Sequence, residues 1–383
     1  MPGFKETTLH EIELPSLPDY APYIFDDASL AALLRIRTST LWWILLYPNN
    51  QYSRYTIPKK RGLRVIHAPR KGMKYILRRA NAYLLSPLHE QLGQHVTAYR
   101  AGRSVRDAVL QHIPFCPVCA AGKATEQHDC PKHGTCIQLD LQDFFPTTRR
   151  AWIRNYFKHV GYSHLVAGYL ASLLTVTNIP NKAFPEFSTR RTFTGAPQGA
   201  PTSGAICNLV ADWRLDTKIL RLLSQWNRAE GYSNSSPHRW RYTRYADDMT
   251  FTIGNKMHGP GVTERLRQIS EVIHQAGYKV NKRKTRWSAY WRRKQLLGMT
   301  FNEHPNLPAD QYRRLRAIVH NCTRYGIDSQ FTKAGFDNSD NFTDWLLGFS
   351  NWAQDINPAK CGPLHQEALT CVNEYRKEQK IAF

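Results

Sequence analysis

Two adjacent acids, Asp247 and Asp248, stand between two runs of apolar and aromatic residues. A third acid, Asp140, ends the apolar segment that begins at Cys136. Like charges held close together repel, and a bound divalent cation is the usual compensation. Taken alone, the paired acids could equally form a polar turn, because Asp favours turns. Asp140 alone could be a strand-end cap.

Together, the three acids fit the needs of phosphoryl transfer. That chemistry uses two metal ions held by a few carboxylates, one activating the attacking oxygen and one binding the triphosphate. We expect Asp140 and Asp247 to bridge two Mg²⁺ ions. Asp248 would be a more peripheral ligand, and Leu141 would add a further metal contact.

Three segments resemble motifs A, B and C of reverse transcriptases in order and spacing: Asp140-Leu-Gln-Asp143-Phe-Phe145, Pro197-Gln198-Gly199 and Tyr245-Ala-Asp-Asp. The resemblance extends from about Leu30 to Gly326. It implies an α/β (α+β) chain built as a right-hand polymerase with fingers, palm and helical thumb, using two Mg²⁺ ions and dNTPs.

The resemblance assigns nucleotide-binding roles to five residues. Phe145 stands where the family has a bulky ring that excludes a ribose 2′-OH, whereas viral RNA-dependent RNA polymerases tend to have an acid there. Gln198 corresponds to the motif B glutamine near the incoming nucleotide, and Asp143 is assigned to the same site. Lys59 and Arg64 match a basic hairpin that grips the triphosphate, a task suited to cationic side chains.

Lys284 matches the motif D lysine thought to protonate the leaving pyrophosphate. The alternative is that Lys284 makes one more phosphate contact, and the sequence does not separate these two roles.

Basic residues dominate the charge of this 383-residue chain, with 52 Lys and Arg against 30 acids and a formal net charge of +22. Residues 54–79 and 279–294 contain no acid and are rich in Lys and Arg. Such clustering favours a polyanionic partner over a merely solubilising surface. We therefore expect a nucleic-acid partner, and the resemblance to reverse transcriptases implies that it is a noncoding RNA template and its cDNA product.

The motifs also resemble the bacterial retron-type group, notably Tyr242-Thr-Arg-Tyr-Ala-Asp-Asp. Two segments depart from it: 108–112 keeps only His112 of an Asn-Ala-x-x-His element, and 296–298 reads Leu-Leu-Gly instead of Val-Thr-Gly. Retron resemblance implies an RNA that is both template and primer, a branched RNA–DNA product, antiphage defence and often an effector protein. The alternative is a related defence enzyme that copies another RNA or adds dNTPs without a template.

A cysteine-rich segment precedes the first acid. Pairs of ligands two residues apart, occurring twice, suit tetrahedral Zn²⁺: Cys116, Cys119, Cys130 and His133. Cys136 and His128 are alternative ligands, and unrelated thiols in a polar loop are the alternative interpretation.

The elements that must position these residues follow from local patterns. We expect a helix over 29–46 capped by Ser29, a hairpin over 54–69, a strand over 135–141, a hairpin over 240–253 and a strand over 295–301. The predicted domains are an N-terminal arm and helix (1–50), fingers with a Cys/His insert at 115–134 (51–134), palm with finger-facing helices at 150–195 (135–302), and helical thumb (303–383).

No apolar run is long enough to cross a bilayer, and the N-terminus lacks a basic-then-apolar leader. We therefore expect a cytoplasmic protein without a membrane partner.

Overall fold

The computed structural model describes residues 17–58, 63–123, 130, 132, 134–177 and 194–381. The chain divides into two compact units. The first contains Met1–Ala101, Leu141–Ile219 and Ile269–Asn281, and the second contains Gly102–Asp140, Leu220–Gln268 and Lys282–Phe383. Over the described ranges, no single helix is long and apolar enough to span a membrane. The helices α1 (Asp27–Leu34) and α2 (Thr38–Leu46) reach that length and hydropathy only when taken together, and a bend of 100° separates them.

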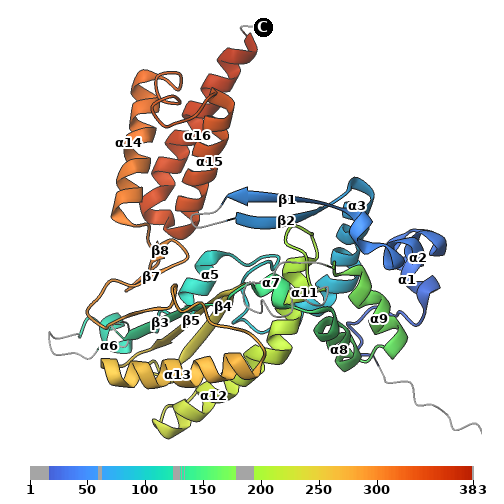
Figure 1. The fold of residues 1–383 in the computed structure, drawn as a ribbon. Helices are drawn as coiled ribbons and strands as arrows, with labels where there is room; N and C mark the ends of the chain where they lie inside the picture. Colours follow the sequence, from blue (N-terminus) through green and yellow to red (C-terminus); the bar gives the residue numbers. More distant parts are fainter. Residues whose placement is uncertain are drawn as a thin grey trace, which may run out of the picture. The chain divides into compact units, whose positions relative to one another are not determined.

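A four-stranded antiparallel sheet forms the centre of the second unit (Figure 1). Its order is β4 (Arg241–Tyr245), β5 (Asp248–Ile253), β3 (Thr135–Asp140) and β6 (Arg286–Ser288). All six residues of β3 are buried, as an apolar central strand requires. The strand predicted over 135–141 and the hairpin predicted over 240–253 are therefore confirmed.

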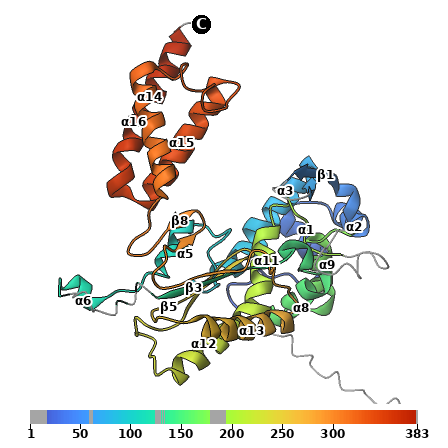
Figure 2. The same ribbon diagram turned by 60° about the vertical axis from the view of Figure 1, so that its left-hand side comes forward.

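Three long helices end the second unit: α14 (Ala309–Tyr325), α15 (Ser339–Ile356) and α16 (Pro358–Ile381), which lie side by side in Figures 1 and 2. The side chain of Asn338 caps α15 by accepting a hydrogen bond from the Asn341 amide at 2.8 Å. The buried core of the helices is continuous with residues of the sheet region, including Cys136 of β3.

The strand predicted over 295–301 is wrong in detail, because the chain reverses within it. β7 (Gln295–Leu296) and β8 (Met299–Thr300) pair antiparallel. The two residues between them have positive φ, 50° at Leu297 and 85° at Gly298. This conformation closes a two-residue hairpin, and glycine adopts it without steric cost.

The first helix predicted by the sequence is two helices, α1 (Asp27–Leu34) and α2 (Thr38–Leu46). Arg35, at φ 54°, ends α1 in the left-handed conformation. Ser29 is not the N-cap. Asp26 caps the helix, and its carboxylate accepts the Ser29 amide at 2.7 Å while the Ser29 hydroxyl accepts the Asp26 amide at 3.0 Å.

The first unit also contains the predicted basic hairpin, formed by β1 (Tyr52–Pro58) and β2 (Leu63–Pro69). Its other described elements include one 3-10 helix and two π-helices: η1 (Pro48–Gln51), and η2 (Asn81–Leu85) and η4 (Asp212–Asp216). The α-helices are α3 (Lys71–Ala80), α4 (Ser86–Glu90), α7 (Phe144–Thr147), α8 (Arg150–Val160), α9 (His164–Leu173) and α11 (Ser203–Ala211). The second unit adds α5 (Val105–Leu110) and α6 (Pro117–Ala120). Helices α12 (Thr217–Ala229) and α13 (Gly259–Gln275) begin in one unit and end in the other.

His112, just after α5, is a buried polar link to the sheet. Its two ring nitrogens lie 2.7 Å from the Thr243 hydroxyl and 2.8 Å from the Thr252 hydroxyl. Burial, with a smaller contribution from the charge of Arg241, lowers the pKa of His112 to about 3. The ring is therefore neutral and joins neighbouring strands β4 and β5, which gives this histidine a structural role.

A second buried histidine behaves in the opposite way in the first unit. His95 Nε2 lies 2.9 Å from Asp212 and 3.6 Å from the fully buried Asp216. Burial opposes protonation, but hydrogen bonds and the charges of both carboxylates outweigh it and raise the pKa of His95 to about 9. A protonated His95 thus forms ion pairs with two acids on η4.

This ion-pair cluster predicts a pH-dependent stability. The pKa of His95 is higher in the folded protein than in the unfolded chain. Its ion pairs therefore contribute fully to the free energy of unfolding below about pH 6.5, and this contribution is lost as the pH rises through about 9. The difference in unfolding free energy between wild type and His95→Gln should be roughly 3 kcal/mol near pH 6 and shrink above pH 9. Thermal unfolding from pH 6 to 10 measures it; a difference independent of pH would contradict the assignment.

Candidate active site

The pairing of β3 with β5 brings the predicted acids together at one end of the sheet. Asp140, the last residue of β3, lies directly opposite Asp248, the first residue of β5. Tyr245 of β4 also pairs with Asp248, so Ala246 and Asp247 form the two-residue turn of the β4–β5 hairpin. All three acids belong to the second unit, within one set of paired strands.

The turn that carries Asp247 has an unusual backbone. Ala246 is buried and has φ 57°, a conformation that side chains disfavour. The guanidinium of Arg244, which is completely buried, donates a hydrogen bond of 3.2 Å to the Ala246 carbonyl. Arg244 thereby supports the turn from inside the hairpin.

The electrostatics of the acids reflect their crowding. Asp248 is exposed, but partial desolvation of its carboxyl group by the surrounding protein, followed by the charges of Asp247 and Asp140, raises its pKa to about 6. Lys284 donates a hydrogen bond of 2.5 Å to Asp140 Oδ1. Partial burial lowers the pKa of Lys284, but the bond to Asp140 and the neighbouring carboxylates outweigh it, so the net shift is upward. Lys284 is therefore a protonated counter-ion at this site.

Arg286 and Gln138 fix the strand that follows Lys284. Arg286 Nε donates to Gln138 Oε1 at 2.7 Å, and Gln138 Nε2 donates to the Gln295 carbonyl at 2.8 Å. Because Gln138 lies on β3 and Arg286 on β6, this chain of bonds ties Lys284 to the strand that carries Asp140.

The donor atoms at this site suit magnesium. Three carboxylates supply only oxygen, which is what Mg²⁺ prefers, and their mutual repulsion calls for a cation. Asp140 is 5% exposed, so its charge is poorly solvated unless a cation is near. Leu141, the further predicted contact, is buried and makes an isolated β-bridge with Val280.

Several predicted nucleotide-binding residues lie in the first unit. Phe144 is buried, while Phe145 is partly exposed and packs edge-to-face on Tyr99 with centroids 6.1 Å apart. Asp143 precedes α7 at φ 49°. A Cβ on Gly204 would lie 2.5 Å from the Tyr99 ring, so glycine at the start of α11 leaves room for the tyrosine.

Motif B contacts the basic hairpin within the same unit. The His67 amide of β2 donates to the Gln198 carbonyl at 2.8 Å. Gly199, at φ 115°, passes so close to β2 that a Cβ would meet Ile66 at 2.9 Å. Arg64 is exposed on β2 opposite Ile57. Lys59 lies outside the described residues.

Sequence reasoning missed Tyr99 and Arg244. Tyr99 is a loop residue with φ 57° and carries no periodic signal, so only the fold reveals its contact with Phe145. Arg244 lies inside the motif that ends in Ala-Asp-Asp. The signal that could have revealed it is a charged residue in the buried middle of a strand.

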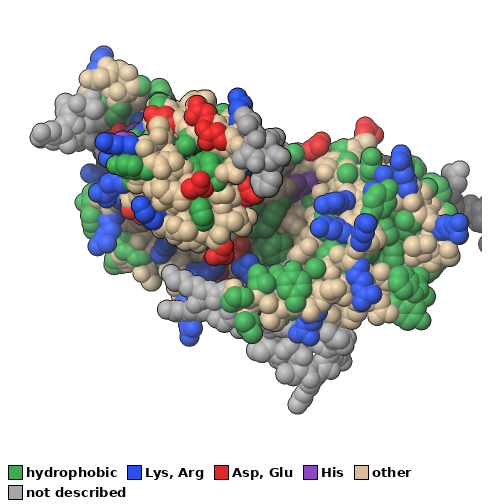
Figure 3. Space-filling view, turned by 90° about the horizontal axis from the view of Figure 1, so that it is seen from above, with side chains coloured by type: hydrophobic (Ala, Val, Ile, Leu, Met, Phe, Trp, Pro, Cys, Tyr) green, Lys and Arg blue, Asp and Glu red, His purple; other side chains and the backbone are tan. Residues whose placement is uncertain are grey.

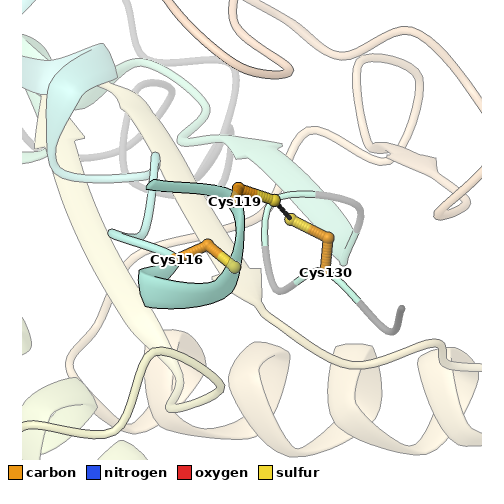
Figure 4. Close-up of side chains that lie close together, drawn as sticks. All are labelled: Cys116, Cys119 and Cys130. Carbon is orange, nitrogen blue, oxygen red and sulfur yellow. Dashed lines mark hydrogen bonds between the residues drawn. The ribbon is translucent and has the colours of Figure 1, made fainter. Parts of the chain in front are cut away.

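The structure brings together the cysteines of the predicted zinc knuckle, as Figure 4 shows. The sulfur atoms of Cys116, Cys119 and Cys130 lie within 4.8 Å of one another. Hydrogen bonds with Cys130 and Cys116, together with burial, raise the pKa of Cys119 to about 11. The alternative ligand Cys136 is instead a buried core residue of β3. His128 and His133 lie outside the described residues.

Comparisons with known proteins agree with the motifs. Retron Mx65 reverse transcriptase of Myxococcus xanthus is 31% identical over 282 residues, 71% of this chain and 56% of that protein. Retron Mx162 reverse transcriptase of the same organism is 29% identical, covering 76% and 58%, and Retron Ec86 reverse transcriptase of Escherichia coli is 23% identical, covering 75% and 74%. The chain thus spans under three-fifths of the two Myxococcus relatives. The predicted retron-type resemblance is confirmed.

A family model described as "Reverse transcriptase (RNA-dependent DNA polymerase)" matches residues 57–301. This range includes the second strand of the basic hairpin, the strand that carries Asp140, motif B and the Ala-Asp-Asp turn. The mixed α/β class predicted for a right-hand polymerase is likewise confirmed. The chain belongs to the reverse transcriptase family.

Proposed function

We propose that this protein is an RNA-directed DNA polymerase of the retron type. The observation that carries the proposal is the register of β3 and β5, which pairs Asp140 with Asp248 beside Asp247. Three carboxylates gathered at one end of the sheet suit two Mg²⁺ ions, which would activate a primer hydroxyl and hold a triphosphate. Family membership supports the same reaction.

The chain's own side chains would supply binding and selectivity. Arg64, exposed on β2, and Lys59 would hold the triphosphate, with Gln198 and Asp143 at the nucleotide. Phe145 would exclude a ribose 2′-OH, and Tyr99 would hold its ring in place. On this proposal residues 51–134 form the fingers, 135–302 the palm and 303–383 the thumb.

Lys284 would act after the acids have positioned the substrate. A protonated ammonium can donate a proton to the leaving pyrophosphate or remain as a phosphate contact, and the geometry is compatible with both roles.

A dedicated noncoding RNA is the proposed template and primer, and branched, RNA-linked DNA is the proposed product. The names of the similar proteins, which are retron reverse transcriptases, and the net charge of +22 support a nucleic-acid partner of this kind. Lys and Arg side chains are dispersed over the face shown in Figure 3. We extend the proposal to antiphage defence with an effector protein encoded nearby.

The alternative function is a defence enzyme that makes cDNA from another noncoding RNA or adds dNTPs without a template. The departures at 108–112 and 296–298 from the retron pattern favour it.

Removing one carboxylate should abolish synthesis. Asp247→Ala deprives the site of a metal ligand, so primer extension on RNA with dNTPs should fall on the order of 10³-fold, since metal catalysis supplies several kcal/mol. Asp337→Ala, which removes an exposed acid elsewhere, is the matched control and should retain wild-type rates. Synthesis by Asp247→Ala at the wild-type rate, or none by wild type, would overturn the proposal.

Replacing the Phe145 ring with a smaller side chain should weaken the discrimination between dNTPs and rNTPs. Phe145→Ala should raise the efficiency of rNTP relative to dNTP incorporation roughly 10- to 100-fold, because the ring excludes the 2′-OH. Tyr99→Ala should shift the same ratio in the same direction but less, since Tyr99 only supports the ring. Single-nucleotide incorporation kinetics give both ratios; an unchanged ratio in Phe145→Ala would rule out this role.

Nucleic acid that co-purifies from the native host should identify the template. The retron proposal predicts one abundant RNA joined to DNA through a 2′-OH, because that RNA serves as both primer and template. Sequencing before and after debranching measures the linkage. DNA without attached RNA, or with untemplated sequence, would instead support the alternative function.

A further inference from the structure

None of the roles proposed above for nucleotide transfer involves the thiol cluster of the second unit. Cys116, Cys119 and Cys130 come from two separate stretches of chain, yet their sulfur atoms converge (Figure 4). We propose that this cluster binds one structural Zn²⁺ ion and that the buried ammonium of Lys294 balances the charge of the zinc–thiolate centre.

The backbone around the first two thiols is folded into a compact turn. The Ala120 amide donates to the Cys116 carbonyl at 3.0 Å, and the Gly122 amide donates to the Cys119 carbonyl at 3.1 Å. This turn presents both sulfur atoms toward Cys130 (Figure 4). A Cys-x-x-Cys turn meeting a third thiol is the arrangement that structural zinc sites use.

Lys294 provides the second, independent observation. Its side chain is 3% exposed, and its ammonium donates to the Lys132 carbonyl at 3.1 Å. No carboxylate pairs with it in the part of the chain that the structure describes. A buried ammonium without an anion is costly.

The anion that Lys294 lacks can come from the cluster. Lys294 interacts electrostatically with the thiols of Cys130 and Cys136. Zinc held by three thiolates and one neutral ligand carries one net negative charge. The centre would therefore supply the compensating anion, and Lys294 would strengthen metal binding from outside the ligand set.

A disulfide is a poorer explanation of the cluster. The sulfur atoms of Cys119 and Cys130 are 3.5 Å apart, whereas a disulfide bond measures about 2.05 Å. Such a bond would not involve the Cys116 thiol and would leave Lys294 without an anion.

The site lies at the entry to the strand that carries Asp140. Cys130 precedes β3 by five residues, and Gly134 passes so close to β5 that a Cβ would lie 1.7 Å from the Ile253 carbonyl oxygen. Zinc would thus fix the chain where it enters the sheet.

Metal analysis of the full chain, purified under reducing conditions, tests the proposal. Wild type should contain about one zinc per chain, and Cys119→Ser should lose it with at least about a 100-fold weaker affinity. Cys371→Ser, which changes a partly exposed thiol on α16, is the matched control and should retain zinc. Lys294→Met should bind zinc roughly tenfold more weakly with all thiols intact.

Cobalt substitution of wild type gives a readout that does not depend on the folding of a variant. Intense sulfur-to-cobalt charge transfer in a tetrahedral spectrum supports the proposal. Wild type that takes up neither zinc nor cobalt while its thiols remain reactive, or Cys119→Ser with unchanged zinc content, overturns it. Because metal content is measured without nucleotides, failure of primer extension would count against the polymerase proposal alone.

Discussion

The register of β3 and β5 is the constraint on which the active site depends. Apolar pairs such as Ile137 with Phe251 and Leu139 with Met249 fix that register inside a buried sheet. The same register sets Asp140 against Asp248, although like charges repel. A slip by one residue would exchange the two faces of β3 and break these apolar pairs. Burial of the strands therefore holds in place a charge arrangement that would not form by itself.

The backbone near the motifs shows the same kind of compensation. Ala246, Asp143 and Tyr99 all have positive φ without being glycine. Such conformations cost of order 1–3 kcal/mol each and persist where the surroundings over-determine them. Arg244 supplies this support for Ala246. Packing against Gly204 supplies it for Tyr99, the residue that contacts Phe145. The strain is thus distributed across both units.

Sequence reasoning succeeded where a residue's position depends on its own strand or turn. Asp140 at a strand end and Asp247 in a hairpin turn are local features, and periodicity indicated both elements. It failed where a backbone conformation decided the outcome, as at Arg35, which splits the predicted helix, and at Leu297, which reverses the predicted strand. The role of Tyr99 could not be predicted from the sequence, because the contact between Tyr99 and Phe145 depends on the fold.

The ammonium of Lys284 occupies Asp140 Oδ1, a position where a metal ion could bind in its place. Lys284 is tethered to the chain, so its local concentration does not fall on dilution, unlike that of a free ion. A metal ion that bound the carboxylates would either share Oδ1 with Lys284 or displace it. If the ion displaced Lys284, the carboxylates would keep a positive partner throughout, and the ammonium would be released to meet a phosphate.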